Sequence, residues 1–500
     1  MSTAPDSPIV IVSNRGPLSY EVDGDKLVAR RGGGGLISGL GPLVDSGQAT
    51  WIAAAMSEGD RVVAGLQAAS EERSGQERSG QERTGQEPTE FELPDSDLSV
   101  ELIALDSHDQ SLYYDVISNG TLWFLHHGLY DLVRSPTYLD DWWDAWDAYR
   151  RVNRAFAERV ARVAPHGATV LIQDYHLTLL PQTLCEARPD LTLIHFLHTP
   201  FAGPDNLRVM PDSARDEMLN SLMAHHACGF HTAEWAANFV DSVERFSDRT
   251  TTEKLGQARL FTSTLSSDPE DIALVSRSPE CEAELGNIES LLVDEAESQV
   301  PARRLIVRVD RMELSKNIVR GFQAFDLLLE RRADLRGRIV FFACCYPSRD
   351  SVAEYTRYRD EVLEAAQKVN DRWTTNDWTP VSLNVDDNYP RSVAALRRYD
   401  VLIVNPIRDG LNLVAKEGPM VNERSGQLVL STQAGAWTEL GEAAIGVNPF
   451  DVAATADAMA RALDIESSER LVRAERLAEL ARERTPADWL ADQLAAAGVA

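Results

Sequence analysis

The segment R-D-G-L-N-L-V-A-K-E, residues 408–417, carries the groups that a nucleotide-sugar site needs. It follows the apolar run V-L-I-V at 401–404, which is typical of a buried parallel strand. We expect the next turn to open into a helix whose first backbone N–H groups point outward, where a diphosphate can bind. Asp409 can hold a sugar hydroxyl, and Glu417, about two turns further on, can reach a ribose diol. The alternative is a surface turn followed by an amphipathic helix.

A glycine run near the N-terminus is a second candidate for binding an anion. The run R-R-G-G-G-G-L (30–36) comes after S-N-R-G-P (13–17) along the chain. Glycines before a helix let backbone N–H groups approach an anion without an obstructing side chain. A nicotinamide-binding fingerprint would place its glycines directly between a strand and a helix, whereas here a charged loop intervenes. A flexible hairpin remains the alternative.

Two cations lie close together in V-D-R-M-E-L-S-K-N (309–317), at the end of a predicted strand. Arg311 and Lys316 could clamp a diphosphate there and stabilise charge on a leaving group. A pair of exposed charges at a helix start is the alternative. Lysine occurs only at Lys26, Lys254, Lys316, Lys368 and Lys416. This rarity draws attention to Lys316 and Lys416, which both lie in site-like segments.

Two shorter motifs, Q-D-Y-H (173–176) and F-L-H-T-P-F (196–201), also follow predicted strands. They place Asp174 and His198 at strand ends, where a hydrogen-bonded structural histidine is the alternative to a catalytic one. No His/Cys/Asp cluster has the spacing of metal ligands, so we expect no metal and no cofactor.

Composition narrows the class of protein. With 500 residues and 44% hydrophobic content, the chain can bury a large core and is expected to form two domains. No apolar run approaches ~20 residues, so we expect no membrane span. The N-terminus lacks the pattern of a secretion signal, so we do not expect export. Five cysteines without C-x-x-C spacing indicate unpaired thiols and a cytoplasmic location. The net charge of −29 disfavours nucleic acid and anionic membranes as partners, and the sequence leaves a homo-oligomer open.

Short β-rich runs alternate with helical periodicity, which predicts βαβ units and an α/β fold with mostly parallel sheets. Strands are expected at 9–13, 169–173, 191–197, 304–309, 338–343, 401–404 and 427–430. Helices are expected at 140–163, 319–330, 351–369 and 452–463. Ligands in such folds bind beyond the carboxyl ends of the strands, where the motifs above fall.

The domain organisation is predicted from breaks in this pattern. An acidic, irregular region at 263–300 separates two α/β halves, so we expect an N-terminal domain at 1–270 and a C-terminal domain at 271–475. The remainder, 476–500, holds a helix at 487–497 that could pack back on the N-terminal domain. Residues 71–90, including three polar pentapeptides at 73–87, are expected to be a disordered insertion.

Taken in order, these segments resemble the trehalose-6-phosphate synthase family. The resemblance runs from Ile9 to about Leu463 and also includes L-Y-Y…S-N-G-T-L-W (112–123), G-F-H-T (229–232), P-S-R (347–349), D-W-T-P (377–380) and V-N-P-F-D (447–451). It implies a retaining glycosyltransferase with the GT-B architecture, in which two Rossmann-like domains carry parallel sheets that face an interdomain cleft.

The resemblance also implies a role for each matching residue. Positions matched to binding of a glucose-6-phosphate acceptor are Arg15, Tyr114, Trp123, Asp174 and Arg349. Positions matched to the nucleotide-sugar donor are Gly33, Gly34, Gly35, Arg311, Lys316, Tyr389, Asp409, Gly410, Leu411, Asn412, Leu413, Val414 and Glu417. Positions expected to take part in catalysis are Asp174, His198, Arg311, Lys316 and Asp409.

The implied activity is transfer of glucose from an NDP-glucose to glucose-6-phosphate, which gives α,α-trehalose-6-phosphate, an osmoprotectant precursor. The chain departs from the family pattern, since R-M-E-L-S-K-N replaces R-L-D-Y-x-K-G, Q-D-Y-H replaces H-D-Y-H, and H-T-P-F-A replaces H-I-P-F-P. The S-K-N variant resembles an actinobacterial-type branch and favours GDP-glucose over UDP-glucose. A sister enzyme with another acceptor (a glucosylglycerol-phosphate synthase or a pseudo-glycosyltransferase) and a non-catalytic regulatory homologue remain alternatives.

Overall fold

The computed structural model describes residues 7–24, 26–31, 35–45, 47–79, 99–247, 259–293 and 302–499. The chain divides into two compact units. Unit 1 comprises Met1–His126, Tyr130–Ser263 and Ala487–Ala500, and unit 2 comprises His127–Leu129 and Thr264–Pro486.

Unit 1 is built on a seven-stranded sheet in the order β5-β4-β1-β6-β7-β8-β9. The strands are β5 (Val100–Ile103), β4 (Ala49–Ala54), β1 (Ile9–Ser13), β6 (Thr169–Gln173), β7 (Thr192–Leu197), β8 (Ala227–Phe230) and β9 (Arg259–Thr262). All neighbours are parallel, so their carboxyl ends meet at one edge. Every residue of β1 and of β6 is buried, which explains why their apolar residues are consecutive (I-V-I-V and V-L-I) rather than alternating with polar ones.

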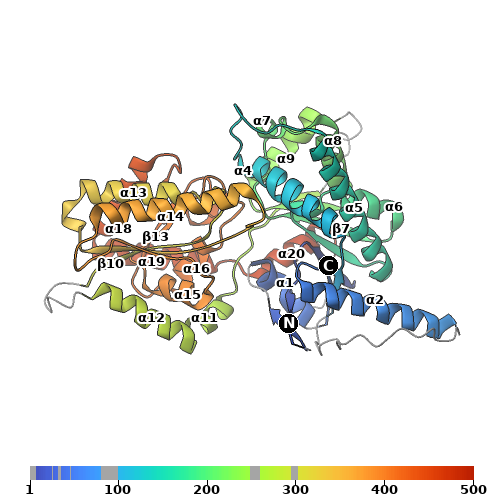
Figure 1. Cartoon of the computed structure of the whole chain (residues 1–500), viewed down its shortest axis with the longest axis horizontal. Coiled ribbons are helices and arrows are strands. Elements are labelled where there is room, and N and C mark those ends of the chain that lie inside the picture. Colours follow the sequence, from blue (N-terminus) through green and yellow to red (C-terminus); the bar gives the residue numbers. More distant parts are fainter. Residues whose placement is uncertain are drawn as a thin grey trace. The chain divides into compact units, whose positions relative to one another are not determined.

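The helices of unit 1 include the predicted long helix α5 (Asp140–Val163), which packs on α6 (Leu180–Ala187) (Figure 1). The others are α1 (Gly35–Asp45), α2 (Glu58–Ser79), α3 (Ser107–Ser111), η1 (Leu112–Leu122), α4 (Trp123–His127), η2 (Tyr175–Leu177), α7 (Pro204–Leu207), α8 (Asp212–Leu222), α9 (Ala233–Phe246) and α20 (Pro486–Ala497). Helix α20 belongs to this unit, and in it Asp492 accepts a hydrogen bond of 2.7 Å from Ser263.

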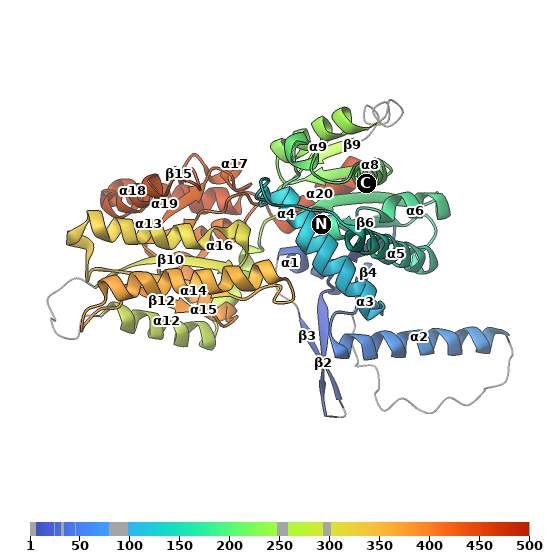
Figure 2. The ribbon, with the colours of Figure 1, turned by 45° about the horizontal axis from the view of Figure 1, so that its top comes forward.

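An antiparallel hairpin of β2 (Leu18–Asp23) and β3 (Lys26–Arg31) lies beside helix α2 (Figure 2). Asp60 holds the two together, because its carboxylate accepts from the backbone amides of Tyr20 and Ser57. The prediction of a disordered insertion from residue 71 is wrong for 71–79, which continue helix α2. Glu, Gln and Arg favour helix, and a helix that is already nucleated extends through them. The rest of the insertion lies outside the described residues.

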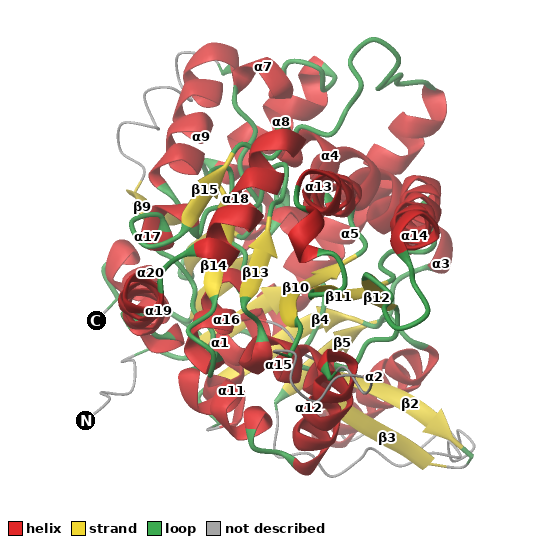
Figure 3. Ribbon diagram, turned by 90° about the vertical axis from the view of Figure 1, so that its left-hand side faces the viewer, coloured by secondary structure: helices red, strands yellow, loops and turns green. Residues whose placement is uncertain are grey.

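Unit 2 contains a six-stranded parallel sheet in the order β12-β11-β10-β13-β14-β15 (Figure 3). Its strands are β12 (Val381–Asn384), β11 (Ile339–Tyr346), β10 (Arg304–Arg311), β13 (Val401–Val404), β14 (Gln427–Ser431) and β15 (Ile445–Val447). Helices α13 (Ile318–Arg331), α14 (Ala353–Trp373) and α18 (Val452–Asp464) cover one face. Helices α11 (Pro269–Ser276), α12 (Pro279–Leu292), α15 (Tyr389–Arg398), α16 (Val414–Val421) and α19 (Ser467–Arg482) lie on the other (Figure 1). Short helices η3 (Leu314–Lys316), η4 (Ala333–Leu335) and α17 (Trp437–Leu440) complete the unit.

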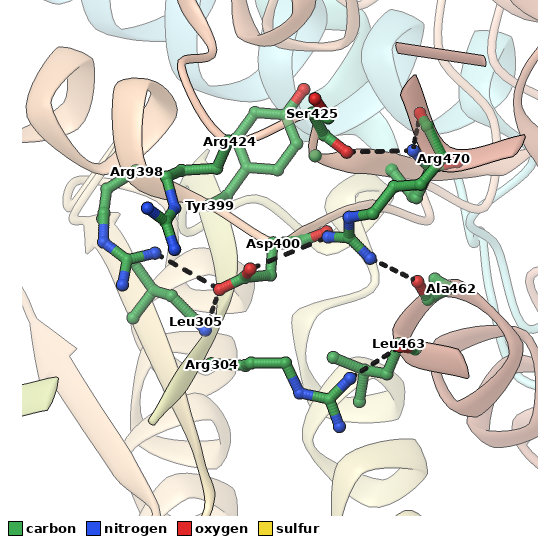
Figure 4. A network of polar contacts seen from close by, with 12 residues as sticks. Arg304, Leu305, Arg398, Tyr399, Asp400, Arg424, Ser425, Ala462, Leu463 and Arg470 are labelled. Carbon is green, nitrogen blue, oxygen red and sulfur yellow. Dashed lines mark hydrogen bonds and ion pairs between the residues drawn. The ribbon is translucent and has the colours of Figure 1, made fainter. Parts of the chain in front are cut away.

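A buried carboxylate, Asp400, fixes the start of two strands in unit 2 (Figure 4). It accepts from the amide of Leu305 in β10 at 2.8 Å and from the guanidinium of Arg398 at 3.3 Å. Arg470 of α19 donates to the Asp400 backbone carbonyl at 2.6 Å. Because β10 and β13 are neighbours, this network holds the amino ends of the sheet and leaves the carboxyl ends for other side chains.

Several predicted elements agree closely with the structure, and one region does not. Strands β1, β6 and β13 and helix α5 have the predicted bounds. The region 263–300 was predicted to be irregular but contains α11 and α12. Asp268 and Ser278 cap these helices, and proline stands in the first turn of each, so the local signals for a helix start were present. Among the described helices, none is long and apolar enough to cross a membrane.

Candidate active site

In unit 1 the first site-like residues follow strand β1. Buried Asn14 accepts a hydrogen bond of 3.0 Å from the Tyr113 hydroxyl. The exposed guanidinium of Arg15 donates to the Tyr114 hydroxyl at 3.2 Å. The Tyr114 ring stacks on His176, with ring centres 5.9 Å apart. The structure therefore brings together the predicted acceptor residues Arg15 and Tyr114.

Tyr114 lies on η1, a π-helix. Helices of this type are rare in proteins as a whole, and those that occur are often found at functional sites. Side chains in η1 donate to carbonyls five residues earlier, which fits the wider π register. Asn119 donates to the Tyr114 carbonyl at 2.9 Å and accepts from the Tyr175 hydroxyl at 2.9 Å. The buried Asn119 thus joins the helix of Tyr114 to the residue that follows Asp174, although sequence reasoning assigned it no role.

Asp174 directly follows strand β6 and has a backbone conformation that few residues other than glycine adopt. Its φ is 68°, and its amide donates to the Phe196 carbonyl at 2.7 Å. One carboxylate oxygen accepts from the His198 amide at 3.2 Å, so the two predicted catalytic residues of unit 1 are adjacent. A strained backbone at a strand end is a feature of functional sites.

His198 follows β7, and its ring is packed among His231, Phe196 and Trp489 of α20. Part of its surface is accessible, yet this crowding lowers the pKa of His198 well below its ordinary value, because burial disfavours the charged ring and the nearby His231 adds repulsion. The ring is therefore neutral at pH 7. Its Nε2 lies 3.0 Å from Gln173 Oε1, the residue that replaces histidine in the family motif.

The remaining predicted acceptor and donor positions of unit 1 are Trp123 and the glycines of the 30–36 segment, and the structure says less about their roles. Trp123, matched to the acceptor, is buried with its ring 5.9 Å from that of Tyr175. Gly35 is the first residue of α1, whereas Gly33 and Gly34 lie outside the described residues.

In unit 2 the carboxyl ends of β10 and β13 bring Lys316 and Asp409 together. The Lys316 ammonium lies 2.6 Å from Asp409 Oδ2, and both side chains are 14% exposed. Burial alone would lower the pKa of Lys316, but the charges of Asp409 and other carboxylates outweigh it and raise the pKa. Burial alone would likewise raise the pKa of Asp409, and Lys316 lowers it. The pair is therefore ionised at neutral pH.

The segment after β13 forms a compact loop before helix α16. The Asp409 amide donates to the Gln433 carbonyl at 3.2 Å, and Ala436 donates to the Leu411 carbonyl at 2.8 Å. Gly410 is packed so closely that a Cβ on Gly435 would lie 2.0 Å from its carbonyl oxygen. Asn412, at φ 82°, donates to Asp409 at 3.1 Å.

The predicted helix start is thus displaced from the turn. Helix α16 begins at Val414, after Leu413, and the Ala415 amide is already taken by Asn412 at 3.2 Å. The sequence predicted that the first N–H groups of this helix point outward and are available to a ligand. This prediction is wrong for the Ala415 amide, which donates to Asn412 instead. The loop has to pack against 433–436 first, which sequence periodicity does not reveal.

Glu417 and Tyr389 lie on two helices of the same face of the sheet. Glu417 accepts a hydrogen bond of 2.6 Å from Ser267, and burial raises its pKa even though part of the side chain is accessible. Tyr389 is the first residue of α15 and is 47% exposed. Lys416 is fully buried against Glu439 at 3.0 Å, which makes it an internal ion pair rather than a ligand-binding group.

Arg311 and Arg349 meet at Glu313, a residue that sequence reasoning did not single out. Glu313 Oε1 lies 3.2 Å from Arg311 and 3.7 Å from Arg349. The motif R-M-E-L-S-K could have drawn attention to Glu313, because it places an acidic residue between two cations. The contact of Glu313 with Arg349 could not be predicted, because Arg349 is distant in sequence. Among the described residues, no group of three or more His, Cys, Asp or Glu side chains is arranged to hold a metal ion.

The profile of glycosyltransferase family 20 matches residues 7–497. The chain belongs to glycosyltransferase family 20. This family 20 chain is 31% identical to a trehalose-6-phosphate synthase of Mycobacterium sp. strain JLS, over 96% of this chain and 94% of the relative. The motif-based resemblance to the trehalose-6-phosphate synthase family and the assignment as a glycosyltransferase are confirmed.

Solved structures are similar over nearly the whole family 20 chain. An α,α-trehalose-phosphate synthase (UDP-forming) from Burkholderia vietnamiensis has a TM-score of 0.75 at 27% identity, with 98% of this chain and all of that chain covered. One from Burkholderia xenovorans in complex with glucose-6-phosphate has a TM-score of 0.77 at 25% identity, with 98% and 100% covered. The predicted α/β fold of the GT-B type, with two parallel sheets, is confirmed.

Proposed function

We propose that this enzyme transfers glucose from an NDP-glucose to glucose-6-phosphate with retention, giving α,α-trehalose-6-phosphate. The observation that carries the proposal is at the carboxyl end of β10 in unit 2, where Arg311 is the last residue of the strand and Lys316, in the helix η3 that follows, pairs with Asp409. Two fixed cations beside an ionised carboxylate suit a diphosphate attached to a sugar, because the cations bind phosphate oxygens and the carboxylate accepts from sugar hydroxyls.

In this reaction the bond between the anomeric carbon and the β-phosphate oxygen breaks. The acceptor hydroxyl attacks from the same face, and its proton passes to the departing phosphate oxygen. Asp409 is held by Lys316 at 2.6 Å, so it serves to orient the sugar rather than as a covalent nucleophile. Arg311 and Lys316 stabilise the charge that develops on the leaving phosphate, which is a contribution specific to the transition state.

For binding of the acceptor we propose the matched residues Arg15, Tyr114, Trp123, Asp174 and Arg349. The exposed guanidinium of Arg15 can bind a phosphate in a bidentate manner, and its contact with Tyr114 limits its freedom. The neutral ring of His198 is suited to a hydrogen bond with the transferred sugar, since it adds no charge that would oppose a developing positive centre.

For the donor base we propose a preference for GDP-glucose, because the S-K-N variant of the cation motif resembles that of an actinobacterial-type branch. UDP-glucose is the competing donor, and the similar Burkholderia structures are of UDP-forming enzymes. We also propose a cytoplasmic location, on the grounds of cysteine usage.

The test is a matrix of donors and acceptors with the purified protein. GDP-glucose and UDP-glucose are each combined with glucose-6-phosphate, glucose and glycerol-3-phosphate at equal concentration, and nucleotide release and the product's anomeric configuration are measured. We expect the highest rate with GDP-glucose and glucose-6-phosphate. A preference for glycerol-3-phosphate would indicate the sister activity, and absence of release with every pair would indicate a non-catalytic homologue.

A further inference from the structure

Glu313 occupies a central position among the cations of unit 2. It lies between the two cations of the 309–317 segment, and its backbone contacts both. Its amide donates to the Arg311 carbonyl at 2.7 Å, and its own carbonyl accepts from the Lys316 amide at 2.9 Å. The side chain is fully buried, whereas that of Arg311 is 47% exposed. Glu313 is thus covered by protein while its cationic neighbour is open to a ligand.

The Glu313 carboxylate contacts two segments that are distant in sequence. Its Oε1 lies 3.2 Å from Arg311 Nη2 and 3.7 Å from Arg349 Nη1, and it accepts from the Ser348 hydroxyl at 3.3 Å. Oε2 has no hydrogen-bond partner among the described residues. Strands β10 and β11 pair in parallel with Arg311 opposite Tyr346, which places the turn containing Arg349 next to Glu313.

Arg349 is held in an unusual conformation. Its φ is 54°, in the left-handed region, and its carbonyl accepts from the Val352 amide at 2.9 Å. Its guanidinium donates to the Tyr355 hydroxyl at 2.6 Å and lies 5.2 Å from the centre of that ring. Such backbone strain persists where surrounding contacts determine the position of a side chain.

Glu313 is ionised at neutral pH. Burial by itself would raise its pKa, but the charges of Arg311, Arg349 and Lys316 lower the pKa to about 2. A buried carboxylate is costly unless it is paired, so the native state is most stable when both guanidiniums remain close to it. The same attraction restricts the rotamers of both arginines.

We propose that Glu313 is a positioning residue whose carboxylate holds the guanidiniums of Arg311 and Arg349 at a fixed separation. The identities of the ligands rest on the proposed function, in which Arg311 binds the donor diphosphate and Arg349 binds the acceptor phosphate. One side chain then sets the binding geometry for both substrates. A residue that only neutralised the cations would have the opposite effect, since its removal would strengthen the binding of phosphates.

The first experiment compares crystal structures of the unliganded parent and Glu313→Gln, which keeps the volume and removes the charge. We expect the Arg311 and Arg349 guanidiniums to move apart by more than about 0.5 Å, the tolerance of a productive site. Guanidiniums that stay in place overturn the proposal. This result does not depend on which substrates the enzyme uses.

The second experiment measures binding of GDP, UDP and glucose-6-phosphate separately by calorimetry. Glu313→Gln is expected to weaken both classes of ligand by about tenfold and to raise KM for both substrates. Glu313→Asp, which keeps the charge and matches the family pattern, should restore most of the affinity. If Glu313→Gln does not fold, the Asp variant is still expected to weaken both classes together, by less than tenfold.

Tyr355→Phe is the matched control, because it removes the hydroxyl that holds Arg349 and leaves Glu313 unchanged. We expect it to weaken glucose-6-phosphate binding and to leave nucleotide binding as in the parent. Unchanged or tighter binding by the Glu313 variants, or weakening of one ligand class alone, overturns the positioning role. A parent that binds neither nucleotide nor glucose-6-phosphate instead overturns the proposed function, and the crystal structures still decide the role of Glu313.

Discussion

Arg311 and Lys316 are proposed to serve the same leaving phosphate, yet their surroundings predict different responses to substitution by alanine. The Arg311 side chain is 47% exposed and shares Glu313 with Arg349. Lys316 is 14% exposed and is paired with Asp409, which is equally buried. Replacing Arg311 therefore removes a charge from an open position, whereas replacing Lys316 also leaves the buried Asp409 carboxylate without its cation.

For Arg311→Ala we expect a loss of transition-state stabilisation of ~3 kcal/mol, which lowers kcat by about a hundredfold. The free energy of unfolding should change by no more than about 1 kcal/mol, because Arg349 and Ser348 still contact Glu313. Lys316→Ala should lower kcat at least as much. It should also cost about 3 kcal/mol of stability, which lowers Tm by roughly 6–12 °C.

The assay is nucleotide release at saturating glucose-6-phosphate, together with thermal unfolding of each variant. Arg357→Ala is the control, since this arginine on α14 is 69% exposed and pairs with Glu354 on the surface. It should leave both kcat and Tm unchanged. Turnover by Arg311→Ala within about threefold of the parent would refute the reasoning, because loss of a cation that contacts the leaving phosphate should lower kcat much more than this.

Three further outcomes follow from unit 1. Arg15→Lys should raise KM for glucose-6-phosphate about tenfold (~1.4 kcal/mol), because an ammonium cannot make the two-pronged contact of a guanidinium. Asn119→Ala should lower the free energy of unfolding by about 2 kcal/mol, because it removes the amide oxygen that accepts a hydrogen bond from the buried Tyr175 hydroxyl. As pH falls from 6.5 to about 4, the free energy of unfolding should decrease by ~1.4 kcal/mol per pH unit for each buried histidine of lowered pKa. The reason is that such a histidine takes up its proton in the unfolded state but not in the native state. His195→Gln should reduce that slope, as measured by urea unfolding.

Each of these outcomes has a result that contradicts it. An equal KM for glucose-6-phosphate in Arg15→Lys and the parent would show that the phosphate lies elsewhere. Unchanged stability of Asn119→Ala would mean that Tyr175 finds another partner. A stability that stays constant between pH 6.5 and 5 would show that His195 and its neighbours gain protons in the native state.

The sequence by itself determined the class of fold and the positions of the candidate residues at strand ends. Runs such as 9–13, 169–173 and 401–404 contain consecutive apolar residues because strands buried on both faces need no alternation with polar ones, so their bounds were predicted. Short strands such as β15 (I-G-V) were missed because packing rather than local pattern stabilises them. The helices after Ser263 were missed although their capping residues and first-turn prolines stand in the sequence. The binding roles assigned to the candidate residues stay predictions.

Only the tertiary structure decided which side chains meet. Glu313 and Arg349 are brought together by the parallel register of β10 and β11, which no local motif encodes. Asn119 reaches Tyr175 because η1 adopts the π register, which side-chain bonds to carbonyls five residues earlier support. Lys416 seemed site-like by its rarity, yet burial against Glu439 gives it a structural partner. In each case the deciding quantity is a distance between residues far apart in sequence, and this distance is set when the sheet and its covering helices pack.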